Sequence, residues 1–429
     1  MTIVLVTFAV LFALLLMRLP IGFALGLAGT VGFGWIVGFS PALKSAGSIA
    51  SDTVLSYDYA VIPMFILMGN LVSRSGISDD LYRASYVWLG GMRGGLALAT
   101  IASCGGFSAV CGSSIATAAT MAKVAVPPMR RYNYADKLAA GSVAAGGTLG
   151  ILIPPSVALI LYGVMTETDI GKLFAAGVIP GLVGILFYMI AVYIWVSISP
   201  EVGPRGPGHS MREKFYALKG VAGITLLFAL VMGGLYVGLF TPTEAAGIGS
   251  GGALLIALAR GRLNVRSFLD VIYDSARTSV ALLTILIGAI LFSNFINVAR
   301  VPQELGLWVG SLDVAPIVVI LTIVGIYVVL GCFLESISMM LLTVPIFYPI
   351  VAELGYDLIW FGIIVIVASE IGLITPPMGM NIFVIRGALP EIPMMTMYRG
   401  VVPFIVADIF RAGVIIFIPA LSLWLPSFM

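Results

Sequence analysis

Apolar residues form runs along this chain that are longer than the elements of a water-soluble core. The run from 2 to 18 contains one charged residue, Arg18, and comparable runs recur to the end of the sequence. About 18 consecutive apolar residues in a helix can cross roughly 30 Å of hydrocarbon. The pattern therefore predicts ten membrane-spanning helices, at 2–18, 20–39, 57–73, 136–165, 171–199, 216–239, 241–259, 278–298, 357–388 and 397–426.

Two further apolar regions, 94–128 and 315–350, are predicted to dip into the membrane and return to the same side. With both regions re-entrant and the N-terminus outside, 17 of the 22 Lys and Arg residues collect on one face. Basic residues in short loops mark the cytoplasmic side of a membrane protein. The charges thus predict that both termini face outward.

Composition supports a membrane protein, because 60% of the residues are apolar and only 10% are charged. A soluble domain carries roughly 25% charged residues. The net charge of +2 gives no indication of a nucleic-acid partner. Cys104, Cys111 and Cys332 lie in apolar segments without metal-ligand spacing and are predicted to be buried thiols, and the single His, His209, is predicted to be a solvated loop residue.

The two halves of the chain repeat one pattern at a shift of 222 residues. Four of the nine prolines in the first 200 residues fall on proline, where the 23 prolines of the chain predict less than one match by chance. Each copy holds five spans, an odd number, so the second copy enters the membrane inverted. The predicted fold is an all-α polytopic membrane protein with a first repeat at 1–199, a cytoplasmic linker at 200–215 and a second repeat at 216–429. Inverted repeats with interrupted helices are typical of secondary transporters.

One predicted span in each copy carries a Gly-x-x-x-Pro-Pro sequence at its centre. These are "GTLGILIPPS" at 147–156 and "SEIGLITPPM" at 369–378. Proline lacks a backbone donor and clashes with the preceding turn, so each span should break there. Irregular backbone at membrane depth occurs where it is buried in protein or lines a cavity. The freed carbonyl groups suit a cation such as Na⁺, and the start of the next half-helix suits a carboxylate.

The tips of the two hairpins offer oxygen atoms that could face these breaks. The first tip is rich in small and hydroxylated residues, including Ser113 and Ser114, although small residues also serve helix packing in lipid. In the second tip, Glu335 replaces Ser113 and is followed by Ser336. A carboxylate at membrane depth is costly and is by default a functional candidate.

Other charged residues at membrane depth have structural alternatives. Glu370 precedes the second break and is either functional or the partner of a buried arginine. Asp408 and Arg411 lie one helical turn apart and are predicted to form a local pair. The segments 41–57 and 262–276 are predicted to be the same interfacial element in the two copies.

The sequence resembles the large membrane subunit of tripartite ATP-independent periplasmic (TRAP) transporters, of the DctM/SiaM type. The resemblance covers nearly the whole chain and rests on six strings in order: "GGFSAVCGSSIATAATMAKVAVPPM", "AAGGTLGILIPPS", "LFAAGVIPG", "TPTEAAGIG", "ESISMMLLTVPIFYPI" and "SEIGLITPPMGMN". It implies an elevator-type, Na⁺-driven importer of organic acids in a bacterial inner membrane, so the termini predicted from the charges to face outward would be periplasmic. It also implies two separate partners, a small membrane subunit of the DctQ/SiaQ type and a periplasmic binding protein of the DctP/SiaP type.

The resemblance also implies site residues, which are assigned by their positions in the matching strings. Two or more Na⁺ ions are expected to be transported per cycle. The implied first Na⁺ site contains Ser113, Ser114, Gly147 and Gly150, and the second contains Glu335, Ser336, Gly372 and Thr375. The organic anion is expected nearer the first break, at Ser113, Ser156, Ser114 and Thr148, because Met378 replaces Ser156 in the second copy. An elevator implies a transport part of approximately 94–199 plus 315–429, moving against a scaffold of approximately 1–75 plus 216–298.

Three other functions fit parts of the pattern. A Na⁺/dicarboxylate symporter that needs no binding protein would share the hairpins and breaks. An ion channel is less consistent with inverted repeats and hydroxyl clusters that lack rings of charge. A membrane enzyme is disfavoured because no His or Cys site and no paired carboxylates at catalytic spacing occur in the sequence.

Overall fold

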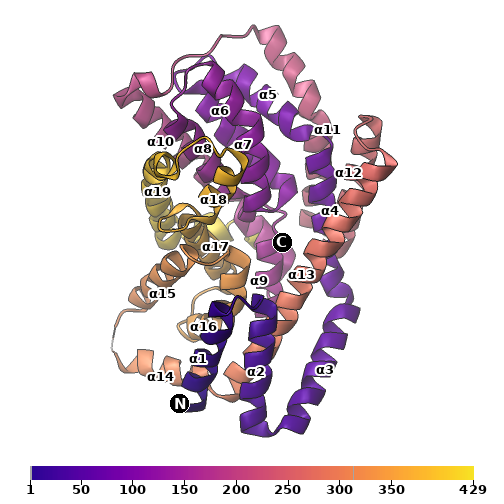
Figure 1. The fold of residues 1–429 in the computed structure, drawn as a ribbon, viewed down its shortest axis with the longest axis vertical. Helices are drawn as coiled ribbons and strands as arrows, with labels where there is room; N and C mark the ends of the chain where they lie inside the picture. Colours follow the sequence, from indigo (N-terminus) through magenta and orange to yellow (C-terminus); the bar gives the residue numbers. More distant parts are fainter. Residues whose placement is uncertain (1, 313) are drawn as a thin grey trace.

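The computed structural model describes residues 2–312 and 314–429, and every regular element in these ranges is a helix (Figure 1). The first copy contains α1 (Thr2–Leu16), α2 (Ile21–Val37), α3 (Phe39–Leu55), η1 (Tyr57–Ala60), α4 (Val61–Arg74), α5 (Ile77–Leu89), α6 (Gly95–Cys111), α7 (Ser114–Arg131), α8 (Asp136–Thr148), η2 (Leu149–Ile151), α9 (Val157–Thr166) and α10 (Ile170–Ile198). After η3 (Pro200–Val202), the second copy contains α11 (Met211–Tyr236), α12 (Pro242–Ala259), α13 (Val265–Val298), α14 (Val301–Ser311), α15 (Pro316–Gly331), α16 (Ser336–Glu353), α17 (Leu358–Ile374), α18 (Met380–Ala388), α19 (Met394–Phe417), α20 (Ala420–Leu423) and η4 (Pro426–Phe428).

The helix boundaries follow the 222-residue register. α7 begins at 114 and α16 at 336, and the same shift relates α2 to α12, α5 to α14, α8 to α17, α9 to α18 and α10 to α19 to within a few residues. Figure 1 places α5 near the upper end of the molecule and its counterpart α14 near the lower end. The two copies are therefore inverted relative to one another.

Five helices are individually long and apolar enough to span a membrane: α10, α11, α13, α16 and α19. The predicted spans 2–18 and 20–39 are the shorter apolar helices α1 and α2. The predicted spans 136–165 and 357–388 are each interrupted, as α8 and α9 and as α17 and α18. The predicted hairpins are likewise present as α6–α7 and α15–α16. The all-helical fold with two breaks and two hairpins is thus confirmed.

The segments 41–57 and 262–276, predicted to be the same interfacial element, are both helical but continue differently into the helix that follows. In the first copy, α3 and the following helix meet at a bend of 55°. In the second copy, the corresponding segment and the following span form the single 34-residue helix α13. Pro63 lies at the start of α4, whereas the equivalent position holds Ile285. A proline in the helix interior removes a hydrogen bond and breaks the helix, so only the second copy can continue without interruption.

Two helices and one helix end differ from the sequence prediction. α5 and α14 were not predicted, because their mixed polar and apolar residues form no long apolar run. The predicted span 397–426 instead ends at Phe417, shortly before Pro419. Proline cannot continue the hydrogen-bond ladder, so the chain turns there into α20.

Outside the hairpins and breaks, helices of one copy pack against helices of the other copy. α2 packs along α13, and its counterpart α12 packs along α4. A Cβ atom at Gly29 of α2 would lie 2.6 Å from Cα of Phe292 on α13. Such close backbone approach through small residues is typical of helix contacts in membranes. Within this group, α4 contacts the hairpin helix α6 and α13 contacts the hairpin helix α16.

Candidate functional site

The first break lies directly against the tip of the first hairpin. α8 ends at Thr148 and η2 at Ile151, and α9 begins only at Val157. A Cβ atom at Gly150 would lie 2.6 Å from the Ser113 carbonyl oxygen and 2.9 Å from the Ser114 nitrogen. A Cβ atom at Gly147 would likewise lie 2.9 Å from the Cβ atom of Ala118 on α7. The structure therefore brings together Ser113, Ser114, Gly147 and Gly150, the four residues expected at the first cation site.

Serine side chains cap the helices that begin at this site. The Ser113 hydroxyl accepts a hydrogen bond from the Ala116 N–H at 3.4 Å at the start of α7. The Ser156 hydroxyl accepts from the Leu159 N–H at 3.3 Å and donates to the Ile151 carbonyl at 2.5 Å. These bonds close the break between η2 and α9, and they occupy the Ser156 hydroxyl more fully than that of Ser113.

The second break repeats the arrangement with different contacts. Glu335 caps α16, and its carboxylate accepts a hydrogen bond from the Ser338 N–H at 3.1 Å. Ser336 is 3% exposed, and its hydroxyl has no hydrogen-bond partner among the residues described. A Cβ atom at Gly372 would lie 2.5 Å from Cα of Gly331 on the hairpin, and the Thr375 hydroxyl donates to the Ile371 carbonyl at 2.5 Å. The nearest neighbours of Gly372 are thus Gly331 and Cys332, one turn before Glu335.

Each hairpin contacts a broken helix of its own copy and one of the other copy. α7 packs against α8 and α18, and α16 packs against α17 and α9. The Asn381 amide on α18 donates to the Ala144 carbonyl on α8 at 3.1 Å, and Asn381 is fully buried. The four half-helices and the two hairpins consequently form one packed unit.

A buried polar network connects the two breaks. Arg411 on α19 donates to the Glu370 carboxylate on α17 at 2.5 Å and lies 2.9 Å from Asp408. The Tyr188 hydroxyl on α10 donates to Asp408 at 2.6 Å and lies in hydrogen-bond contact with the Thr148 hydroxyl at 2.9 Å. All five side chains are fully buried. Thr148 and Glu370 occupy equivalent positions in the 222-residue register, so the network runs from one break to the other.

The network bears on two predictions made from the sequence. Glu370 is the partner of a buried arginine, and the predicted Asp408–Arg411 pair is present. Thr148, expected at the substrate site, donates instead to the Ala145 carbonyl and contacts Tyr188. Tyr188 and Asn381 were not singled out from the sequence, because a tyrosine or asparagine in an apolar run is common and only its partner reveals its role.

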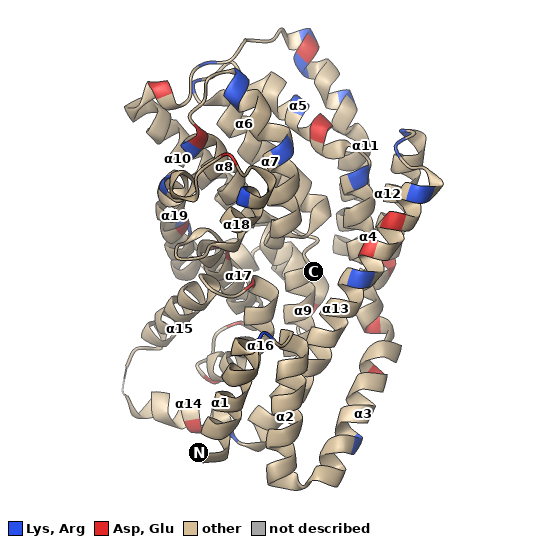
Figure 2. Ribbon diagram, viewed as in Figure 1, with Lys and Arg blue, Asp and Glu red and all other residues tan. Residues whose placement is uncertain are grey.

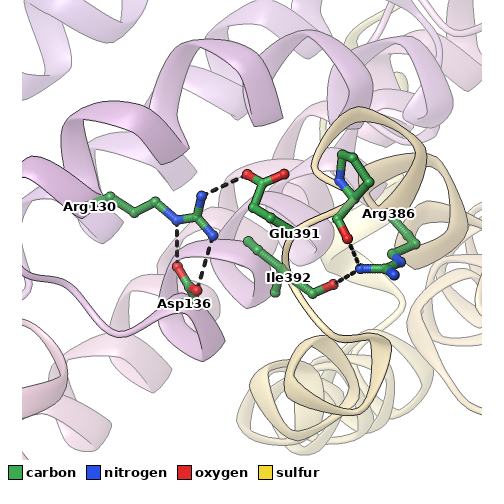
Figure 3. Close-up of polar contacts among 6 residues, drawn as sticks. Arg130, Asp136, Arg386, Glu391 and Ile392 are labelled. Carbon is green, nitrogen blue, oxygen red and sulfur yellow. Dashed lines mark hydrogen bonds and ion pairs between the residues drawn. The ribbon is translucent and has the colours of Figure 1, made fainter.

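Lys and Arg gather at the upper end of the molecule in Figure 2, interspersed with acidic residues, and we call this end the basic end. At this end Arg130 on α7 donates to Asp136 and Glu391, each at 2.7 Å, and Arg386 donates to the Pro390 and Ile392 carbonyls (Figure 3). A hydrogen bond from its own backbone N–H, followed by Arg130, lowers the pKa of the Glu391 carboxyl. These contacts join the base of the first hairpin to the α18–α19 loop of the second copy.

His209 is less exposed than the sequence predicted. Its ring packs edge-on against Tyr86 with centroids 5.2 Å apart, and 21% of its side-chain surface is accessible. His209 lies in a loop, as predicted, but is partly buried rather than freely solvated. The linker that carries His209 folds back onto α5 rather than extending away from the protein.

Solved structures with this architecture are membrane transporters. The fold matches the YdaH transporter of Alcanivorax borkumensis with a TM-score of 0.66 at 14% identity, over 90% of this chain and 88% of that chain. It also matches MtrF of Neisseria gonorrhoeae, described as one of a class of antimetabolite efflux pumps, with a TM-score of 0.53 at 15% identity, over 88% and 84% of the two chains. At these identities the likeness concerns the fold.

The family follows from the sequence comparisons. Residues 8–421 match the family described as "Tripartite ATP-independent periplasmic transporter, DctM component". The C4-dicarboxylate TRAP transporter large permease protein DctM of Pseudomonas aeruginosa is 36% identical over 95% of this chain and 94% of its own length. The sialic acid TRAP transporter large permease protein SiaM of Vibrio cholerae is 32% identical over 90% and 89%. The chain belongs to the DctM family and is a TRAP transporter large permease subunit.

Proposed function

We propose that this subunit carries a small organic acid across the bacterial inner membrane by an elevator mechanism driven by Na⁺. The observation that carries the proposal is the pairing of each helix break with a hairpin inside one packed unit. Broken helices in inverted repeats are the usual binding elements of secondary transporters. The family membership adds that the transporter is of the tripartite type.

Na⁺ ions would bind where the breaks face the hairpins. The first site would use the tip residues Ser113 and Ser114 with the backbone at Gly147 and Gly150, which the packing supports. The second would use Glu335, Ser336, Gly372 and Thr375. The free Ser336 hydroxyl is available for a cation. Two ions or more per cycle would match the two breaks, and bound Na⁺ would supply positive charge that favours the substrate anion.

The organic anion would bind beside the first break, at the N-termini of α7 and α9. These helix ends place the positive end of the dipole at Ser113 and Ser156, which favours a carboxylate. Ser114 would contribute at the same helix end. Thr148 would act through Tyr188 rather than touch the anion. The similar relatives transport C4-dicarboxylates and sialic acid according to their names, so both classes are candidates here.

The partners would be a small DctQ/SiaQ-type membrane subunit and a periplasmic DctP/SiaP-type binding protein. An isethionate TRAP transporter permease named DctMQ is 31% identical over 96% of this chain but only 64% of its own length. The name of this relative combines the M and Q designations, which supports a Q-type partner for this chain. We place both termini on the periplasmic side, because the basic end would then face the cytoplasm.

The test is uptake into proteoliposomes that contain this subunit and its small subunit. We expect accumulation of an organic acid that requires an inward Na⁺ gradient and the cognate binding protein. Uptake that depends on Na⁺ but not on the binding protein would instead identify a two-component symporter. Na⁺ currents that do not depend on the acid would identify a channel.

A further inference from the structure

A cavity of about 340 Å³ opens at the basic end between α5 and α11. Its lining comes from α5, from the segment before α11 and from the first turns of α11: Arg83, Tyr86, Val87, His209, Arg212, Glu213, Tyr216 and Ala217. The cavity lies outside the unit of hairpins and broken helices. Transport of the organic acid therefore does not account for it.

The walls of this cavity are held by specific contacts. The Tyr86 hydroxyl donates to that of Tyr132 at 3.0 Å, and the Trp88 indole N–H donates to the Lys214 carbonyl at 3.1 Å. Arg260 on α12 donates to Asp80 on α5 and, at 2.7 Å, to the Gly220 carbonyl on α11. These bonds fix α5 relative to α11, so the cavity is a built feature of the fold.

Two arginines face the cavity from opposite walls without a carboxylate partner. Neither Arg83 on α5 nor Arg212 on α11 forms an ion pair within 4.0 Å among the described residues. The nearby Arg130 and Arg260 are both paired with acids. Glu213, the acid in the lining, turns to the start of its own helix and accepts from the Ser210 N–H at 2.7 Å. Glu213 also accepts from the Ser210 hydroxyl at 2.8 Å, so its carboxylate caps α11 and forms no ion pair within 4.0 Å with Arg83 or Arg212.

We propose that this cavity binds the phosphate headgroup of an anionic phospholipid. Arginine pairs bind phosphate oxygens with fork-like geometry, and basic pockets between helices bind anionic lipid headgroups. Val87, Tyr216 and Ala217 supply apolar surface for the glycerol and upper acyl region, and tyrosines are favoured at this depth. The lipid would join α5, which leads into the first hairpin, to the start of the second copy at α11.

The proposal can be tested by lipid binding to the purified transporter in detergent, measured by native mass spectrometry. We expect phosphatidylglycerol to bind more tightly than phosphatidylcholine. The double variant Arg83→Gln/Arg212→Gln should weaken phosphatidylglycerol binding about tenfold. The control Arg266→Gln/Arg277→Gln, which removes two exposed arginines from α13, should bind as the native protein does.

Three results would overturn the proposal. They are equal affinity for the two lipids, equal affinity of the cavity variant and the control variant for phosphatidylglycerol, or Arg-dependent binding of inorganic phosphate as tight as that of the lipid. Unchanged melting temperatures of both double variants would show that the difference arises at the site. Because the readout is lipid binding, the outcome does not depend on the proposed transport function.

Discussion

At the residue scale, the two hairpins differ most at their equivalent tip positions, Ser113 and Glu335. Both side chains cap the following helix, but only Glu335 has a group that can carry a charge there. The dipole of α16 favours that charge, and a bound cation would favour it further. Substituting glutamine retains an oxygen that can cap the helix and removes only the charge.

We therefore predict that Glu335→Gln raises the Na⁺ concentration for half-maximal uptake by about tenfold, the change expected from losing a nearby opposite charge. The measurement is uptake as a function of Na⁺ at saturating organic acid. Glu353→Gln, at the exposed far end of the same helix, is the matched control. An unchanged Na⁺ dependence in Glu335→Gln would remove Glu335 from the second site.

The contact between Gly150 and the first hairpin tip gives a second prediction. In Gly150→Ala the new methyl group would meet the Ser113 backbone, and overpacking of this kind costs about 1–3 kcal/mol. We expect lower thermal stability and a strong loss of uptake. Gly413→Ala is the control, because no atom lies within 4 Å of a Cβ atom at Gly413 on α19. Full activity of Gly150→Ala would show that the tip and the break can separate without loss of function.

At the element scale, the sequence predicted the positions of the interrupted helices better than it predicted the continuity of α13 or the contacts between helices. The paired Gly-x-x-x-Pro-Pro sequences located both breaks, since proline and glycine act on the backbone locally. The continuity of α13 depended on Ile285 in place of Pro63, a difference that a search for shared features overlooks. The Tyr188 contacts could not be predicted, because α8, α10 and α19 meet only through tertiary packing.

The buried network links α8, α10, α17 and α19 and gives a third prediction. Arg411→Met would leave Glu370 and Asp408 buried without their positive partner, which costs about 3–5 kcal/mol. We expect a marked fall in the melting temperature of the purified protein. The triple variant Arg411→Met/Glu370→Gln/Asp408→Asn should recover much of the loss, because no uncompensated charge remains. A triple variant as unstable as the single one would show that packing, rather than charge, limits stability here.

At the scale of the whole molecule, the exchanged packing of α2 with α13 and of α4 with α12 binds the two copies into one framework. The hairpins and broken helices form a second group, also built from both copies. The prediction assigns the first group to the scaffold and the second group to the transport part. Their relative motion remains a prediction, since the sequence repeat defines equivalent elements but not which of them move.

A cavity of about 380 Å³ between the two groups allows that motion to be tested. It is lined by Ala109 on α6 and Ile224 on α11, among others. In a protein whose three native cysteines are replaced by alanine, Ala109→Cys/Ile224→Cys should react with a short reducible cross-linker. We expect cross-linking to abolish uptake and reduction to restore it, because the link joins the predicted transport part to the predicted scaffold.

The control variant is Asn70→Cys/Ser275→Cys. These two residues share a hydrogen bond of 2.8 Å within the predicted scaffold, so their cross-link should leave uptake intact. Sustained uptake by the fully cross-linked 109–224 protein would contradict an elevator mechanism with this division.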